Sequence, residues 1–478
     1  MCIVPMMPRK IRSHLPPMSR VSRGRAGLAT DSTSLRSCDK GPGYVSHASF
    51  WNTDSSRPIR VGGCHLEFSS DENHITGPKR IWPHLCSMPF LVQRPRCRLC
   101  YAFGMINGRV VVAMSGGVDS SVAALLLKQQ GYDVVGVTMR LWTEERGDVP
   151  ASAKRCCSVE DIDDARRVCQ KIGVPHYVMN LEREFQEHVV DYFCQEYDRG
   201  RTPHPCLACN DKIKFDFLLK RALFLDADYI ATGHYARVAR NGKAYRLLKG
   251  LDASKDQSYV LFTLGQAELS RLLLPIGEVD KADVREMAAD AGLAVADKPD
   301  SQEICFIPSG DYRKFIEDRG TPRPGDLVDM DGALIKQHPG VQFFTIGQRR
   351  GLGLPGGGTS PVFVTDIDPE TNRVTVGAES DLYRDILWAS GLSFTSGHPP
   401  EGPIPVTVKI RYKSSANRAT LTMRGDWATV QFEEPQRAIT PGQPAVFYNG
   451  DEVVGGGFIE VREPSPIQVA QVGLPSAV

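Results

Sequence analysis

Short apolar runs alternate with stretches of helical spacing through residues 105–308. The runs that we interpret as buried strands lie at residues 110–113, 133–142, 176–181 and 229–234. Apolar runs without polar alternation are typical of parallel strands that are covered on both faces. Helical spacing follows three of these runs, at residues 118–130, 158–173 and 185–197. This alternation predicts an α/β domain built on a doubly wound parallel sheet.

The pattern changes after this first domain. Residues 309–384 are rich in Gly, Pro and short strands, which predicts a small mixed central domain. From residue 385 onward short strands of alternating polarity follow one another, and Asn449-Gly450 is a strong hairpin-turn signal. We therefore expect residues 385–463 to form a small antiparallel β-barrel, and residues 464–478 to be a disordered tail.

Residues 1–104 differ from the rest of the chain. They are rich in Arg, Ser, Pro and Gly and lack sustained periodicity. They are interpreted as a disordered extension, as an Arg/Ser-rich targeting peptide, or as the product of a mis-called start codon with Met105 as the true first residue. We favour the last interpretation, because the predicted domain needs nothing upstream of Met105.

Charge and cysteine content narrow the class of protein. The net charge of +1 hides a basic segment over residues 1–104 and an acidic remainder, so a nucleic acid would need a local basic groove. No apolar run approaches the roughly 20 residues of a membrane span, and no secretory signal opens the chain. The 13 cysteines are spread thinly, which favours reduced thiols and a cytoplasmic location. Clustered cysteines in such a chain suggest catalysis or a metal site.

The most informative stretch is Val110 to Gln130, which reads VVVAMSGGVDSSVAALLLKQQ. A buried strand meets the turn Ser115-Gly116-Gly117, and a helix starts close to Asp119. Such a turn directs backbone N–H groups and the positive end of a helix at an anion, usually phosphate. No Gly-Lys-Ser/Thr follows at the spacing of a Walker A loop. The string instead resembles the pyrophosphate loop of the ATP-pyrophosphatase (PP-loop) superfamily, which implies cleavage of ATP to AMP and pyrophosphate and adenylation of a substrate oxygen.

Two further loops contain conspicuous cysteines. The first, residues 201–215, holds Cys209 just before an amphipathic helix, and a thiol at a helix N-terminus has a lowered pKa. The second, residues 300–308, holds Cys305 among polar residues. Either cysteine alone would be interpreted as a small buried hydrophobe. Together, in a domain that is expected to activate an oxygen with ATP, they suggest sulfur chemistry.

At this point the chain from Met105 to about Arg462 resembles the bacterial tRNA-specific 2-thiouridylases, which place sulfur at carbon 2 of the wobble uridine of certain tRNAs. The resemblance rests on many separated strings in the same order, which makes it specific. They are Ala113-Met-Ser-Gly-Gly-Val-Asp-Ser120, Arg201-Thr-Pro, Cys209-Asn210, Ile213-Lys-Phe215, Ala231-Thr-Gly-His-Tyr235, Lys255-Asp-Gln-Ser-Tyr259, Asp300-Ser-Gln-Glu-Ile-Cys305, Gly325-Asp326, Thr345-Ile-Gly-Gln348 and Thr440-Pro-Gly-Gln443.

The resemblance implies a role for particular residues. The implied ATP site consists of Ala113, Met114, Ser115, Gly116, Gly117, Val118, Asp119, Ser120, Met139 and Gly233. The implied catalytic residues are the nucleophile Cys209 and the persulfide carrier Cys305. The implied contacts with the target base and the rest of the tRNA are His204, Pro205, Cys206, His234, Lys255, Asp256, Gln257, Arg411, Tyr412 and Gln443. ATP, Mg²⁺ with the help of Asp119, a tRNA substrate and a sulfur donor or cysteine desulfurase relay are expected, and the protein is expected to be a monomer.

One position departs from the family pattern. Many members have an aspartate where this chain has Cys206. The thiolates of Cys206, Cys209 and Cys305 could hold an iron–sulfur cluster with one open iron position. Alternatively, Cys305 carries a persulfide and pairs transiently with Cys209 as a disulfide. The sequence leaves the two mechanisms open.

Two other functions compete with thiolation. Another PP-loop synthetase of the amidotransferase type would need ammonia delivery, and no glutaminase domain fits the available length. A nucleotide-responsive RNA-binding protein without chemistry is the alternative from a different class. The presence of Cys206, Cys209 and Cys305 together argues against it.

Overall fold

The computed structural model describes residues 107–142, 159–300, 304–307, 310–354 and 361–463. The interpretations of residues 1–104, the start at Met105, the tail over 464–478 and the helix start at Ser158 lie outside these ranges. None of the helices within the described ranges is long and apolar enough to cross a membrane.

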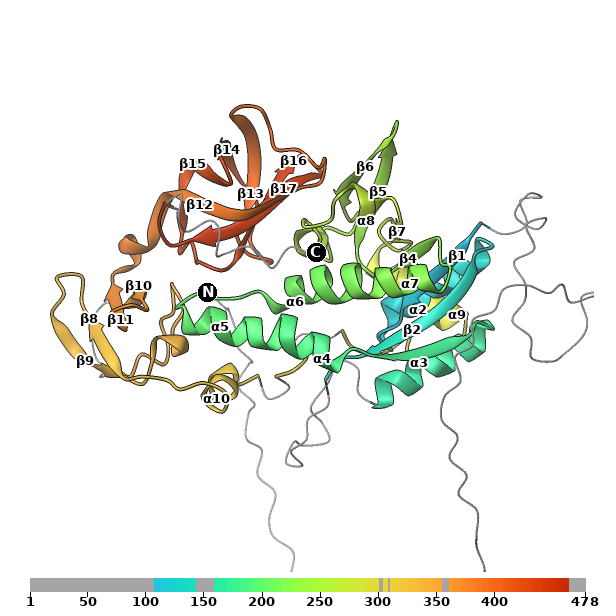
Figure 1. Cartoon of the computed structure of the whole chain (residues 1–478), viewed down its shortest axis with the longest axis horizontal. Coiled ribbons are helices and arrows are strands. Elements are labelled where there is room, and N and C mark those ends of the chain that lie inside the picture. The colour runs from blue at the N-terminus through green and yellow to red at the C-terminus, as the bar shows by residue number, and fades with distance from the viewer. Residues whose placement is uncertain (1–106, 143–158, 301–303, 308–309, 355–360, 464–478) are drawn as a thin grey trace, which may run out of the picture. The chain divides into compact units, whose positions relative to one another are not determined.

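A parallel sheet forms the first part of the chain, as predicted. Its strand order is β3-β2-β1-β4-β7, and neighbouring strands pair in parallel. Figure 1 labels β1, β2, β4 and β7 of this sheet. The strands are β1 Arg109–Ala113, β2 Asp133–Arg140, β3 His176–Asn180, β4 Tyr229–Ala231 and β7 Leu272–Leu273. Val111 packs into one hydrophobic core, and Val110 and Val112 pack into another. Alternate side chains of the central strand are therefore buried on both faces of the sheet, which explains its unbroken apolar run.

Helices supply the partners for both faces. One core contains side chains of α2 Val118–Gln129, α3 Val159–Ile172 and α9 Lys281–Asp290. The other contains side chains of α4 Glu182–Phe185, α5 Tyr192–Asp198, α6 Pro205–Ala208 and α7 Leu219–Phe224. Two π-helical segments, Gln186–Asp191 and Cys209–Leu218, continue α4 into α5 and α6 into α7. The remaining short helices are α8 Gln266–Leu269 and α10 Tyr312–Glu317.

A second, mixed sheet follows, with strand order β10-β11-β8-β9. Its strands are β8 Gly325–Val328, β9 Leu334–His338, β10 Phe363–Asp368 and β11 Arg373–Gly377. The pairing of β11 with β8 is parallel and the others are antiparallel. Leu327, Phe343, Val364 and Val374 contribute to its own core.

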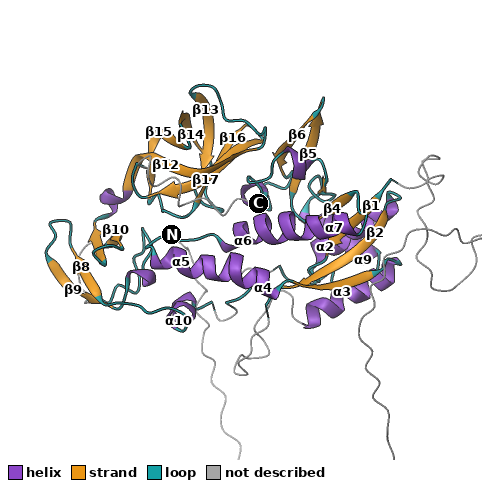
Figure 2. Cartoon of the chain, in the orientation of Figure 1, coloured by secondary structure: helices purple, strands orange, loops and turns teal. Residues whose placement is uncertain are grey.

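The last part of the chain is a closed antiparallel barrel, also as predicted. Its strands are β12 Tyr383–Phe394, β13 Ile404–Lys409, β14 Asn417–Arg424, β15 Trp427–Arg437, β16 Pro444–Asn449 and β17 Glu452–Glu460. They run in the order β12-β15-β14-β13-β16-β17, and pairing of β12 with β17 closes the ring. Figure 2 shows this strand-rich end of the chain in contrast to the helices around the parallel sheet.

One hairpin was not predicted. Strands β5 Ala236–Asn241 and β6 Ala244–Lys249 follow directly after β4 and pair with each other. Glu452 of β17 pairs with Leu248 of β6, so the barrel sheet extends into a segment of the first domain. No local sequence pattern predicts this pairing, because the paired residues lie about 200 positions apart.

Candidate active site

The turn after β1 has the geometry of a phosphate-binding loop. Gly116 has a φ of 71°, and a Cβ atom built there would lie 2.3 Å from the carbonyl oxygen of Asp161, so no larger residue fits. The Ser120 hydroxyl accepts a hydrogen bond from the Ser115 N–H at 3.2 Å. The Ser121 hydroxyl donates to the Gly117 carbonyl at 2.8 Å, which ties the turn to the first turn of α2. The N–H groups of that first turn have no partner within the helix and are suited to an anion.

The other residues predicted for the ATP site come from neighbouring strands. A Cβ atom at Gly233, just after β4, would lie 2.6 Å from the Ser120 nitrogen and 2.7 Å from the Asp119 carbonyl carbon. Gly233 therefore packs directly on the phosphate loop. Met139 is buried near the end of β2. Since β2, β1 and β4 are adjacent, the predicted residues share the carboxyl edge of the sheet, where open α/β sheets bind ligands.

Lys298 anchors the loop, although no local pattern around this lysine indicates such a role. Its ammonium lies 2.9 Å from the Gly116 carbonyl oxygen and 2.6 Å from carboxylate oxygens of both Asp161 and Asp164. Burial alone would lower the pKa of Lys298, but the hydrogen bonds to Asp161 and Asp164 raise it. The cation therefore stays charged and holds the loop against α3.

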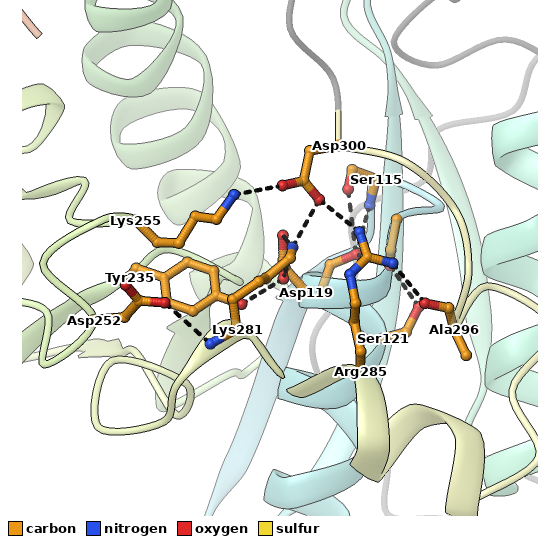
Figure 3. A network of polar contacts seen from close by, with 12 residues as sticks. Ser115, Asp119, Ser121, Tyr235, Asp252, Lys255, Lys281, Arg285, Ala296 and Asp300 are labelled. Carbon is orange, nitrogen blue, oxygen red and sulfur yellow. Dashed lines mark hydrogen bonds and ion pairs between the residues drawn. The ribbon is translucent and has the colours of Figure 1, made fainter. Parts of the chain in front are cut away.

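Asp119 lies in a network of polar contacts (Figure 3). Its Oδ1 accepts a hydrogen bond from the Tyr235 hydroxyl at 2.7 Å. The Lys281 ammonium lies 2.6 Å from Oδ1 and 2.8 Å from Oδ2. Among the described residues, no group of three His, Cys, Asp or Glu side chains could hold a metal ion. Both oxygens of Asp119 thus serve an ion pair, and its role toward Mg²⁺ stays a prediction.

The network continues to Asp300. Lys281 reaches Asp300 Oδ1 at 2.9 Å, Lys255 reaches Oδ2 at 2.9 Å and Arg285 reaches Oδ1 at 3.1 Å. Burial would raise the pKa of Asp300, but hydrogen bonds from Lys281 and Lys255 lower it to about 2. Lys255, which was predicted to contact tRNA, is therefore an ion-pair partner of Asp300 in this structure.

The two residues after Lys255 also make contacts within the protein. The Asp256 carboxylate accepts hydrogen bonds from the backbone N–H groups of Gly250 at 3.2 Å and Ser258 at 3.1 Å. The Gln257 side-chain oxygen accepts from the Tyr235 N–H at 2.9 Å. These side chains shape the loop beside the phosphate site, and their predicted contacts with tRNA remain untested.

The prediction that Cys209 lies at a helix N-terminus is wrong. The helix starts at Pro205, and α6 continues through the π-helical segment into α7. His204 is the N-cap, and its Nδ1 accepts a hydrogen bond from the Leu207 N–H at 3.3 Å. Cys206 is therefore in the first turn and exposed, whereas Cys209 lies one turn further and is half-buried. The argument from the helix N-terminus applies to Cys206 instead.

Cys209 and Cys305 pack against the same hydrophobic core, although almost 100 positions separate them. Phe306, the neighbour of Cys305, is fully buried in that core beside Phe185 and Phe193. Although all three predicted cluster ligands are described, they do not form a group that could hold a metal ion. The donor set of an iron–sulfur cluster is thus not assembled in this structure.

Aromatic and basic side chains gather near Cys206. The Tyr412 ring lies 6.1 Å from the Tyr259 ring, which lies 5.8 Å from the His204 ring. Burial raises the pKa of Tyr412, with smaller contributions from Asp256 and Cys206. The Lys409 ammonium is 5.7 Å from the centroids of both tyrosine rings.

Sequence reasoning did not assign a role to Tyr259 or Lys409. Tyr259 ends a string that carried the family resemblance, and Lys409 lies two positions before Arg411. Burial lowers the pKa of the His204 imidazole to about 4, so that this ring is neutral at pH 7.

The barrel holds the loop that precedes Cys206. Arg201 forms ion pairs with Glu196, at 2.7 Å, and with Glu460 of β17. The Gln443 side-chain amide donates to the carbonyl oxygens of Thr202 at 2.9 Å and Pro203 at 3.1 Å. Gln443, which was predicted to contact tRNA, therefore fixes the backbone just before the helix that contains Cys206.

Two other predicted tRNA contacts are engaged within the protein. Arg411 donates to the carbonyl oxygens of Arg437, at 3.0 Å, and Ala438. His234 is buried, and its Nδ1 is 2.6 Å from the Thr232 hydroxyl. Burial, with a smaller effect of Lys214, places the pKa of His234 well below its usual value. A buried neutral imidazole is suited to packing beneath the site rather than to binding a phosphate.

Comparison with known proteins defines first the class and then the family. Three family models match in succession: a tRNA methyl transferase HUP domain over residues 108–309, a tRNA methyl transferase PRC-barrel domain over 313–378 and an aminomethyltransferase beta-barrel domain over 384–459. The tRNA-specific 2-thiouridylase MnmA of Carboxydothermus hydrogenoformans is 51% identical over 360 residues, covering 74% of this chain and 98% of the relative. That of Lachnoclostridium phytofermentans is 49% identical over 356 residues, covering 73% and 99%. The chain belongs to the family of tRNA-specific 2-thiouridylases.

Solved structures resemble the chain only weakly. The NMN synthetase of Francisella tularensis has a TM-score of 0.27 and 16% sequence identity, covering 42% of this chain and 69% of the synthetase. The family assignment rests on the sequence relatives.

Proposed function

We propose that this protein is a tRNA-specific 2-thiouridylase, a sulfurtransferase that replaces the O2 atom of the wobble uridine with sulfur. ATP is the activating substrate, and AMP and pyrophosphate are released. One observation carries the proposal: Lys281 joins the phosphate loop to Asp300, five positions before Cys305, while Cys305 and Cys209 pack against one core. An activating site and a pair of thiols are thus supported by one sheet.

In the first step, the uridine O2 attacks the α-phosphate of ATP, and pyrophosphate leaves. The loop over Ser115–Ser120 would bind the phosphates through its backbone N–H groups and the N-terminus of α2. Mg²⁺, when bound, would be held with the help of Asp119 and would neutralise further charge on the pyrophosphate. The target uridine must leave its stack, since carbon 2 is inaccessible within a stacked anticodon.

In the second step, the terminal sulfur of a Cys305 persulfide attacks carbon 2, and AMP departs with the former O2 atom. The Cys209 thiolate then attacks the inner sulfur of Cys305 and breaks the S–S bond. The terminal sulfur stays on carbon 2 as the thiocarbonyl, and a Cys209–Cys305 disulfide is formed. A two-electron thiol reductant restores the thiols, and a sulfur donor or cysteine desulfurase relay reloads Cys305.

The RNA is proposed to approach where His204, Lys409 and Tyr412 gather around the buried Tyr259 ring near Cys206. Aromatic rings suit an unstacked base, and a cation suits the phosphate beside it.

We propose that the chain has three domains, at residues 105–308, 309–384 and 385–463. We further propose a monomer in the cytoplasm, which sedimentation and cell fractionation would test.

The decisive assay incubates the protein with Mg-ATP, a persulfide donor, a thiol reductant and unmodified tRNA, followed by nucleoside mass spectrometry. We expect 2-thiouridine to accumulate together with AMP. Cys209→Ser and Cys305→Ser should each abolish thiolation but retain ATP-dependent adenylation. Cys194→Ser, which changes another half-buried thiol, is the matched control. Full thiolation by either active-site variant would contradict the assigned roles.

A second experiment separates the two sulfur mechanisms. The persulfide route predicts that Cys206→Asp retains thiolation, because many family members have aspartate there. The cluster route predicts that this variant loses both activity and bound iron. Anaerobic purification with quantification of iron and acid-labile sulfide provides an independent readout. Stoichiometric iron that disappears in Cys206→Asp would overturn the persulfide route.

A further inference from the structure

Lys281 is positioned between two segments that are far apart in the chain. It is the first residue of α9, and its side chain is 10% exposed. Its ammonium contacts both oxygens of Asp119, at 2.6 and 2.8 Å, and one oxygen of Asp300 at 2.9 Å (Figure 3). An ammonium group has only three protons to donate. These contacts therefore use its full capacity, and a change at one carboxylate affects the other.

The two carboxylates have different surroundings. Asp119 is the second residue of α2 and part of the phosphate loop, so a nucleotide with its cation arrives beside it. Asp300 makes no hydrogen bond to that loop among the described residues, and its other partners are Lys255 and Arg285. Asp300 also starts the string that ends in Cys305. Lys281 is thus the shared partner of Asp119 in the loop after β1 and of Asp300, which precedes Cys305 by five positions in the sequence.

We infer that Lys281 is a positioning residue that couples nucleotide binding to the placement of the Cys305 segment. A ligand that binds the carboxylate of Asp119 competes with Lys281 for the oxygens of Asp119. Because this ion pair is then weaker, the ion pair between Lys281 and Asp300 also changes. Because coupling between sites is reciprocal, the position of Asp300 also changes nucleotide affinity. The inference rests on the proposed function, since it assumes that the loop binds ATP and that Cys305 carries sulfur.

The test measures how bound nucleotide changes the reactivity of Cys305. The reduced full-length protein is treated with iodoacetamide, with and without Mg²⁺ and α,β-methylene-ATP, and alkylation of Cys305 is quantified by peptide mass spectrometry. In the unmodified protein we expect the analogue to change the alkylation rate by at least about fivefold, the lower end of typical coupling. In Asp300→Asn the change should fall below about twofold, because the Asp119–Lys281 pair remains but its link to Asp300 is broken.

Arg285→Met is the matched control. It removes another ion-pair partner of Asp300 without touching Asp119, so the nucleotide response of Cys305 should persist. Analogue binding is measured by calorimetry for each variant, and alkylation is compared at saturating analogue. Lys281→Met should lose the response as Asp300→Asn does, and a thermal melt verifies its folding.

A full nucleotide response in Asp300→Asn, or equal loss in Arg285→Met, would overturn the coupling. So would the absence of any response in the unmodified protein when calorimetry shows the analogue bound. These outcomes differ from failure of the proposed function, which would be absence of 2-thiouridine in the tRNA assay. The alkylation readout requires neither tRNA nor a sulfur donor.

Discussion

The side-chain amide of Gln443, in the barrel, donates to the carbonyl oxygen of Thr202 at 2.9 Å, four residues before Cys206. A second hydrogen bond from the same amide to Pro203 makes the contact bidentate. A return contact runs from the Thr202 N–H to the carbonyl oxygen of Pro441 at 2.8 Å. The helix that starts at Pro205 and contains Cys206 and Cys209 is thus positioned in part by contacts with the barrel.

Gln443→Leu should lower turnover at saturating tRNA about tenfold or more, because two hydrogen bonds of about 1 kcal/mol each are lost. Steady-state kinetics would be combined with a separate measurement of tRNA affinity. Gln337→Leu, at an exposed position in β9, is the control. A variant with unchanged turnover and weaker tRNA binding would instead support direct contact with the RNA.

Gly233→Ala should weaken ATP binding about tenfold or more, since overpacking costs about 1–3 kcal/mol. The added Cβ atom would lie 2.6 Å from the Ser120 nitrogen and must displace the phosphate loop. Gly402→Ala is the matched control, because a Cβ atom there meets nothing within 4 Å. Calorimetric titration with α,β-methylene-ATP measures both affinities, and equal values would show that the loop accommodates the methyl group.

Arg201→Met should lower the free energy of unfolding by about 3–5 kcal/mol, since it leaves uncompensated charges in a buried site. The side chain of Arg201 is 9% exposed, and those of its partners Glu196 and Glu460 are 6% and 13% exposed. Arg199→Met removes a 57% exposed partner of Glu196 and should cost less than about 1 kcal/mol. Urea denaturation compares the two variants, and similar losses would contradict the dependence on burial.

Stability should decrease as the pH falls below about 6.5, partly because of His234. Burial places the pKa of this imidazole well below 6.5 in the folded protein. The unfolded chain therefore binds a proton in a range where the folded protein does not, and acid favours unfolding. His234→Gln should show a flatter dependence of the unfolding free energy between pH 7 and 5, with His398→Gln at an exposed position as the control. An unchanged slope in His234→Gln would contradict this account.

The conformation of the turn after β1 could be predicted because its determinants are local. Gly116 is required by its φ of 71° and by the Asp161 carbonyl oxygen, and the serines tie the turn to the adjacent helix. An apolar run, a glycine turn and a helix within 21 residues contain this information themselves. The parallel sheet and the barrel followed from periodicity in the same way, since burial on one or both faces imposes a pattern on each strand.

The helix start was predicted wrongly for an equally local reason. Cys209 was expected to lie in a loop just before a helix, whereas the helix already starts at Pro205, in a position that proline favours. His204 then serves as the N-cap. Cys206 therefore lies in the first helical turn and Cys209 one turn further, which matters for the reactivity of their thiols.

By itself, the sequence determined the strand–turn–helix that suits a phosphate and the order of the three folds. It also indicated which cysteines are candidates for the chemistry. Only the tertiary structure decided that Lys281 meets Asp119 across 162 positions and that Gln443 holds the cysteine loop across 241. A lysine or glutamine carries no local pattern that names its partner. Their contacts arise where a sheet edge and a barrel bring remote segments together, and Lys281 there joins the loop after β1 to Asp300.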